Sequence, residues 1–143
     1  MRVTLDTNVL VAAFISRGVC HDLFEYLLRH HTFVCSEYIL DEFRSVLITK
    51  IRIPKDKADA SEQLIRSRAV MVEDAQLDER VSRDPDDDWI LAAATNSSST
   101  CLITGDDDLL SLRSFRGVEI LRPRDFWEYE IRKTPGDPDE TTR

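Results

Sequence analysis

The sequence has few of the residues that mark several common protein classes. Its three cysteines, Cys20, Cys35 and Cys101, are odd in number and widely spaced, so they predict neither a disulfide framework nor a zinc site. Only four glycines are present, and none forms a Gly-rich phosphate loop or a dinucleotide-binding motif. No apolar run approaches the roughly 20 residues that span a bilayer. We therefore expect a cytoplasmic protein without a membrane segment or a secretory signal.

The chain is also poor in basic residues. Its 19 Lys and Arg against 27 Asp and Glu give a net charge of -8, which disfavours a protein that coats DNA independently of sequence. Nucleic acid still stays open as a partner, because divalent cations can neutralise acids and local basic residues can contact phosphate. The candidates for such contacts are Arg17, Arg44, Lys50 and Arg83.

What the sequence does contain is an alternation of short apolar runs and amphipathic stretches. Strands are predicted near residues 2–6, 32–36, 69–73, 101–104 and 117–121, and helices near 8–16, 20–30, 37–49, 55–67 and after Asp84. This alternation predicts a single α/β domain in which a parallel sheet is covered by helices on both faces. The domain is expected over residues 1–133, and residues 134–143 are expected to be a disordered tail because they carry little to bury.

Two of the predicted strands lead into carboxylates. Asp6 directly follows an apolar run, and Asp106 follows the run Cys101-Leu102-Ile103-Thr104-Gly105. In open α/β sheets, binding sites form in the crevice beyond the carboxyl ends of the strands. On the predicted helix 37–49, Glu42 lies at the edge of the apolar face and can reach a neighbouring crevice, whereas Asp41 points toward water.

A further group of acids opens the helix after Asp84. Asp84 is a suitable cap, Pro85 suits the first helical position, and Asp86-Asp87-Asp88 complement the helix dipole. From Ile90 to Ala94 this helix is apolar on all sides, so it should be buried with its acidic start near the strand ends.

Together these acids indicate a divalent metal site. Mg²⁺ and Mn²⁺ prefer oxygen ligands, and two such ions about 3.5–4 Å apart can activate water and stabilise an in-line phosphoryl displacement. Each acid alone is more often a cap, a turn former or a surface residue than a ligand, so the prediction depends on their coincidence. Asn8 and Thr104 are expected to orient the carboxylates by hydrogen bonds, with capping and turn formation as their alternative roles.

Trp89 and Trp127 are expected in the core or at an interface.

Four motifs in this order resemble PIN-domain ribonucleases, and among them the PIN-family (VapC-like) toxins of bacterial and archaeal toxin-antitoxin pairs. They are Leu5-Asp6-Thr7-Asn8-Val9-Leu10, Ser36-Glu37-Tyr38-Ile39-Leu40-Asp41-Glu42-Phe43, Asp84-Pro85-Asp86-Asp87-Asp88 with Ile90-Leu91-Ala92-Ala93-Ala94, and Thr104-Gly105-Asp106-Asp107-Asp108-Leu109-Leu110. The resemblance spans about Val3 to Trp127. It implies a three-layer α/β/α PIN-like fold whose parallel sheet has the strand order 3-2-1-4-5.

The resemblance also implies the activity and the site. It implies a Mg²⁺- or Mn²⁺-dependent endoribonuclease with an RNA substrate, a small antitoxin as partner, and a homodimer. The implied catalytic acids are Asp6, Glu42, Asp88 and Asp106, and the implied metal ligands are Asp6, Asp88, Asp106 and Asp108. Asp88 is preferred over Asp87 because of its distance before Ile90-Leu91.

Two other functions remain open from the sequence. A PIN-fold module that binds RNA or protein without cutting would typically lack one of the four acids, whereas all four are present. A phosphatase or phosphoacceptor domain would need an Asp-x-Asp nucleophile, where this chain has Asp6-Thr7-Asn8, or a late lysine after a strand. The leading hypothesis is therefore RNA hydrolysis by metal-activated water, without a side-chain nucleophile.

Overall fold

The computed structural model describes residues 1–133, and the predicted disordered tail, residues 134–143, lies outside the described residues. The strands are β1 (Arg2–Leu5), β2 (Thr32–Ser36), β3 (Val70–Val72), β4 (Cys101–Ile103), β5 (Ser114–Phe115) and β6 (Val118–Leu121). The α-helices are α1 (Thr7–Ile15), α2 (Val19–His30), α3 (Glu37–Val46), α4 (Lys55–Arg68), α5 (Pro85–Asn96), α6 (Asp107–Leu110) and α7 (Phe126–Lys133). A π-helical turn, Leu47–Ile51, continues α3, and a 3-10 turn, Pro123–Asp125, precedes α7.

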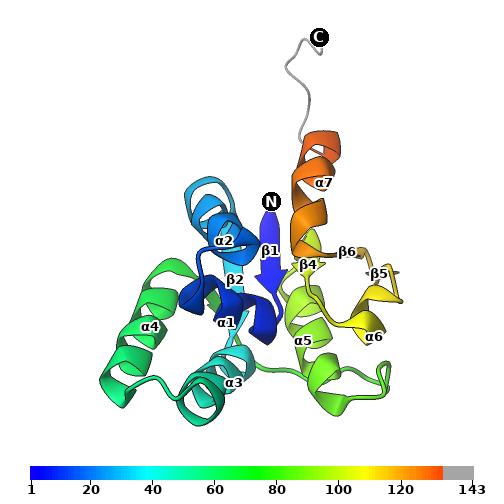
Figure 1. Cartoon of the computed structure of the whole chain (residues 1–143). Helices are drawn as coiled ribbons and strands as arrows, with labels where there is room; N and C mark the ends of the chain where they lie inside the picture. The colour runs from blue at the N-terminus through cyan, green and yellow to red at the C-terminus, as the bar shows by residue number, and fades with distance from the viewer. Residues whose placement is uncertain (134–143) are drawn as a thin grey trace.

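The strands form one sheet with the order β3-β2-β1-β4-β6-β5, arranged among the helices as Figure 1 shows. All neighbouring strands are parallel except β5, which pairs antiparallel with β6. The predicted order 3-2-1-4-5 is confirmed for the five parallel strands, with β6 as the fifth. From β1 the chain first adds strands on one side of the sheet and then crosses to the other side at β4. Because such crossovers are right-handed, α5 covers the face opposite to α1–α4.

This reversal positions the candidate site. β1 and β4 are neighbours, yet the connections that leave their carboxyl ends run in opposite directions along the sheet. Such a switch point opens a crevice between the two connections. The carboxyl end of β1, which leads into α1, lies away from the N-terminus and α7 (Figure 1).

The boundaries of the elements follow from local sequence. Ser36 caps α3, since its hydroxyl accepts a hydrogen bond from the Ile39 amide at 3.1 Å. The segment of α5 from Ile90 to Ala94 is buried throughout, as its all-round apolar sequence predicts. At the β5–β6 turn, Arg116 and Gly117 have φ values of 50° and 86°. Two consecutive positive φ values are the mark of a tight two-residue hairpin, which the five-strand prediction missed because β5 has only two residues.

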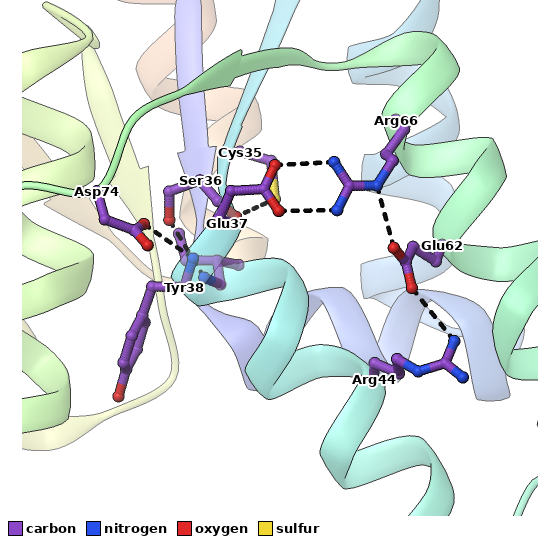
Figure 2. Close-up of polar contacts among 9 residues, drawn as sticks. Cys35, Ser36, Glu37, Tyr38, Arg44, Glu62, Arg66 and Asp74 are labelled. Atoms are coloured by element: carbon purple, nitrogen blue, oxygen red, sulfur yellow. Dashed lines mark hydrogen bonds and ion pairs between the residues drawn. The ribbon is translucent and has the colours of Figure 1, made fainter.

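The first turn of α3 is fixed by polar contacts with the chain around it (Figure 2). The Arg66 guanidinium on α4 donates to both carboxylate oxygens of Glu37 at 2.7 and 2.8 Å and to Glu62 at 3.0 Å. Glu62 also accepts from Arg44 at 3.2 Å, so Arg44 binds α4 instead of projecting freely toward a substrate. On the other side, the Asp74 carboxylate accepts from the Tyr38 amide at 2.8 Å.

We expect Arg66→Ala and Arg66→Lys to lower the thermal unfolding midpoint by a few degrees, because neither side chain can bridge Glu37 and Glu62 as the planar guanidinium does. The decrease should shrink in high salt, because these groups are partly exposed and are screened. Arg68→Ala is the charge-matched control on the same helix. Equal midpoints for Arg66→Ala and Arg68→Ala would contradict a structural role for this network.

Among residues 1–133, no helix combines the length and the apolar character needed to cross a bilayer.

Candidate active site

The centre of the candidate site is a hydroxyl between two acids. The Asp6 amide donates to the Ile103 carbonyl at 2.9 Å, so the pairing of β1 with β4 extends to this residue. The fully buried Thr104, which follows β4, donates its hydroxyl to Asp6 Oδ2 at 2.6 Å. The same hydroxyl accepts from the Asp106 amide at 3.0 Å. Thr104 therefore links the two strand-end acids that the sequence pattern selected.

Asp6 is the acid at the end of β1, and Thr104 connects it to Asp106. Asp6 is buried, and burial is the main cause that raises its pKa, while the hydrogen bond from Thr104 lowers it and the charges of Asp106 and Asp84 raise it again. The structure thus places a carboxylate where its negative charge is disfavoured unless a cation is present.

Glu42 reaches the same region from α3. It is half-buried and accepts a hydrogen bond from the Thr7 hydroxyl at the start of α1, whereas Asp41 is exposed as the helical pattern predicts. Burial raises the pKa of Glu42 most, and the charges of Asp86 and Asp6 raise it further. Thr7 was not selected from the sequence, although its place directly after Asp6 is a usable signal.

The acids at the start of α5 point in different directions. Asp84 caps the helix by accepting from the Asp86 amide at 2.9 Å, and Asp86 accepts from the Tyr38 hydroxyl. Asp87 is buried and accepts from the Ser82 hydroxyl at 2.9 Å. Asp88 accepts from the backbone amides of Val81 and Ser82 at 3.1 and 2.8 Å, which ties it to the loop before α5.

The structure brings together Asp87, Asp106 and Asp108, whose carboxylates each offer an oxygen within 4.8 Å of the others. Asp88, which the sequence analysis preferred over Asp87, is outside this group because its two oxygens bind the loop amides. Adjacent helical residues project about 100° apart, so only one of the two can face the strand ends. We refer to Asp87, Asp106 and Asp108 as the acid cluster.

The electrostatics of the acid cluster favour a cation. Burial raises the pKa of Asp87 to about 6, and the charges of Asp106, Asp84 and Asp6 act in the same direction against a partial offset from Ser82. Three converging carboxylate oxygens are the donor set that hard divalent cations take. The residues present therefore fit Mg²⁺ or Mn²⁺.

Two other residues complete the description of the site. Arg83 Nη2 lies 2.7 Å from Asp108 Oδ1, so a guanidinium stands at the rim of the acid cluster. Arg83 was selected from the sequence only as a phosphate contact, and spacing gives no signal for its pairing with Asp108. The Asn8 side chain is exposed and makes no hydrogen bond within residues 1–133, whereas Thr104 makes the contacts predicted for it.

The fold and the site together define an α/β domain with converging acids at the carboxyl edge of a mostly parallel sheet. The sequence profile of the PIN domain matches residues 2–108, and the chain therefore belongs to the PIN-domain family. No curated protein sequence matches the chain.

Solved structures share this fold. VapBC2 from Rickettsia felis, bound to a DNA fragment from its promoter, aligns with a TM-score of 0.60 and 17% identity over 84% of this chain and 97% of that chain. VapBC-1 from nontypeable Haemophilus influenzae aligns with a TM-score of 0.60 and 14% identity over 87% and 99%. VapC20 from Mycobacterium tuberculosis, a toxin that cleaves the sarcin-ricin loop, aligns with a TM-score of 0.57 and 15% identity over 82% and 98%. At these identities the similarity concerns the fold.

Proposed function

We propose that this chain is a Mg²⁺- or Mn²⁺-dependent endoribonuclease and the toxin of a type II toxin-antitoxin pair. The observation that carries the proposal is the acid cluster, in which Asp87, Asp106 and Asp108 offer oxygens within 4.8 Å of one another beside the buried Asp6. Family membership and the fold shared with VapC20, a toxin that cleaves the sarcin-ricin loop, support the same function.

In the proposed reaction, water attacks a phosphodiester of RNA. Asp87, Asp106 and Asp108 would hold the divalent ion, which supplies charge that activates water and stabilises negative charge on the phosphate. Asp6, buried at the end of β1, adds negative charge that acts on Asp87. Glu42, held by Thr7 and with a raised pKa, is suited to accept the proton of the attacking water. The phosphorus–oxygen bond to the leaving ribose breaks, and that oxygen takes up a proton.

The test is cleavage of a diverse RNA pool by the purified full chain in Mn²⁺, in Mg²⁺ and in EDTA. We expect cleavage only with metal, and loss of at least a thousandfold in Asp6→Asn and Asp106→Asn, on the order of the effect of removing an essential catalytic group. Folded variants that cleave like the wild type would overturn the assignment. Metal binding without cleavage of any RNA would favour a PIN-fold module that binds without cutting.

The partner and the assembly follow from the same proposal. The structural relatives include VapBC complexes and FitAcB from Neisseria gonorrhoeae. These complexes support a small antitoxin as the partner of this chain. From the resemblance to PIN-family toxins we also propose a homodimer that acts in the cytoplasm. Co-purification with the product of an adjacent small reading frame, and the mass of the purified chain in solution, test these two points.

We expect Arg83→Ala to tighten divalent metal binding several-fold, because the guanidinium competes with the ion for Asp108. Isothermal titration calorimetry with Mn²⁺ measures this change directly. The matched control is Arg122→Ala, since Arg122 lies 3.7 Å from Asp107, an exposed acid outside the acid cluster. Equal tightening in both variants would mean that only the net charge matters, and no tightening in Arg83→Ala would exclude the competition.

A further inference from the structure

A hollow lies on the loop side of α5, the helix whose first turn also carries Asp87 of the acid cluster. It has a volume of about 310 Å³ and lies between α5 and the loop that connects β3 to α5. Its apolar wall consists of Leu77, Pro85 and Trp89, and its polar wall includes Gln76 and Arg80. A mostly apolar hollow with a few placed polar groups is typical of sites for small molecules.

The apolar wall includes an aromatic platform. The rings of Trp89 and Tyr38 stack at a centroid distance of 5.4 Å and an interplanar angle of 10°. Tyr38 is held at both ends, because its amide donates to Asp74 and its hydroxyl donates to Asp86 (Figure 2 shows Tyr38 beside Asp74). Trp89 is therefore held in a fixed plane while it remains partly exposed.

Ser82 connects the hollow to the acid cluster through hydrogen bonds. Ser82 donates its hydroxyl to Asp87, which belongs to the acid cluster, and its amide to Asp88, which lines the hollow. The two acids are adjacent on α5, so the first turn of this helix contributes one acid to the acid cluster and the next acid to the hollow. Asp88 also lies 3.8 Å from Arg80 Nε, which orients that guanidinium at the hollow.

The charges of the hollow favour a base over a phosphate. Glu79 and Asp88 together outnumber the single cation Arg80 in the lining, which disfavours an anion. A neutral planar base can stack on Trp89 while Gln76 and Arg80 donate hydrogen bonds to its edge. Sequence-specific recognition of single-stranded RNA uses this combination of aromatic stacking and contacts to base edges.

We propose that this hollow is a nucleobase subsite that binds one base of an RNA strand held at the acid cluster. Trp89 stacks on the base, and Arg80 and Gln76 contact its edge. The subsite rests on the proposed function, because it requires RNA to pass over the acid cluster. It gives Trp89, which the sequence placed in the core or at an interface, a role in substrate selection.

Binding without cleavage tests the subsite. The chain has two tryptophans, so Trp127→Phe leaves Trp89 as the sole indole reporter. In an Asp106→Asn, Trp127→Phe background, we would titrate 2′-O-methyl decamers of A, C and U and follow tryptophan fluorescence. We expect saturable quenching, with a Kd that differs among the three decamers.

Variants of the lining identify the contacts. Trp89→Ala lacks the reporter indole, so its binding is measured with a labelled decamer. This variant should bind roughly tenfold to a hundredfold more weakly, and Trp89→Phe should retain most of the affinity. Arg80→Ala and Gln76→Ala should reduce the preference among decamers. Because both positions are exposed, these variants can test the subsite even if Trp89→Ala fails to fold. Trp127→Phe alone should bind like the wild type.

Each outcome separates the subsite from the nuclease. If the wild type cleaves RNA and Trp89→Ala, Arg80→Ala and Gln76→Ala cleave the same sequences at the same rates, the subsite is wrong and the nuclease stands. If decamers bind through Trp89 and no RNA is cut, the hollow is a base-binding site, but the nuclease falls and with it the role of this site in selecting a substrate for cleavage. If only a co-expressed partner protein changes Trp89 fluorescence, or nothing does, the subsite is overturned.

Discussion

Asp87→Asn is expected to make the metal-free protein more stable at pH 7 and to abolish RNA cleavage. The Asp87 pKa of about 6 lies above the ordinary value of 3.8, so ionising this buried group in the folded protein opposes folding. Each pKa unit corresponds to about 1.4 kcal/mol, so the variant should gain up to about 3 kcal/mol. Asparagine retains an oxygen that accepts from Ser82 but cannot supply the anionic ligand that a divalent ion needs.

The pH dependence of the free energy of unfolding shows whether the ionisation of Asp87 stabilises or destabilises the fold. Between pH 3.8 and about 6 the unfolded chain has lost the Asp87 proton while the folded chain retains it. The contribution of Asp87 to the free energy of unfolding therefore decreases as the pH rises through this window and is level above it. Urea unfolding of the metal-free protein at several pH values measures this contribution. In Asp87→Asn, the free energy of unfolding should change less with pH in this window.

Asp88→Asn is the matched control, because it makes the same change one residue further along α5. Both Asp88 oxygens accept from loop amides, and asparagine keeps only one such acceptor, so this variant should lose about 1–2 kcal/mol of stability. Its metal affinity should change much less than that of Asp87→Asn. Loss of metal binding in Asp88→Asn, with Asp87→Asn unaffected, would restore the assignment made from the sequence and contradict the one made from the structure.

Asp87 and Asp88 illustrate how much of the candidate site could be predicted from the sequence. Asp6 and Asp106 were found because each follows a buried strand, and parallel strands deliver their ends to one edge of a sheet. Glu42 was found because its helix has a clear apolar face. No such pattern shows which way Asp86, Asp87 and Asp88 point, because α5 is apolar on all sides after its first turn. Which acid faces the strands depends on how the preceding loop packs, and that loop has no periodic pattern.

The contacts that the sequence missed have the same physical origin. Arg83 pairs with Asp108 across 25 residues, and Thr7 with Glu42 across 35 residues, so no local spacing predicts either contact. The order of the parallel strands came from the family resemblance, and the structure agrees with it. The two-residue strand β5 depends on a turn with two positive φ values, one of them at Arg116, where residue preference argues against such a conformation.

The buried hydroxyl between the strands is the other position where a small change should have a large effect. Thr104→Val keeps the shape of the side chain but removes the donor to Asp6 and the acceptor for the Asp106 amide. A buried amide without a partner costs about 1–3 kcal/mol, so the variant should be measurably less stable. Loss of groups that orient metal-binding carboxylates typically reduces metal affinity or activity roughly tenfold to a hundredfold, which is the expected decrease in cleavage.

A pH profile separates orientation from a general loss of structure. The Thr104 hydrogen bond lowers the pKa of Asp6, so without it that pKa rises further and more of Asp6 is protonated at a given pH. The acidic limb of the cleavage profile should therefore move to higher pH in Thr104→Val, and Thr104→Ser should restore both the limb and the rate. A decrease by the same factor at every pH, with no rescue by serine, would mean that Thr104 supports only the packing of the sheet. A shifted limb would show instead that one hydroxyl sets the charge of Asp6 while it holds Asp106 in place.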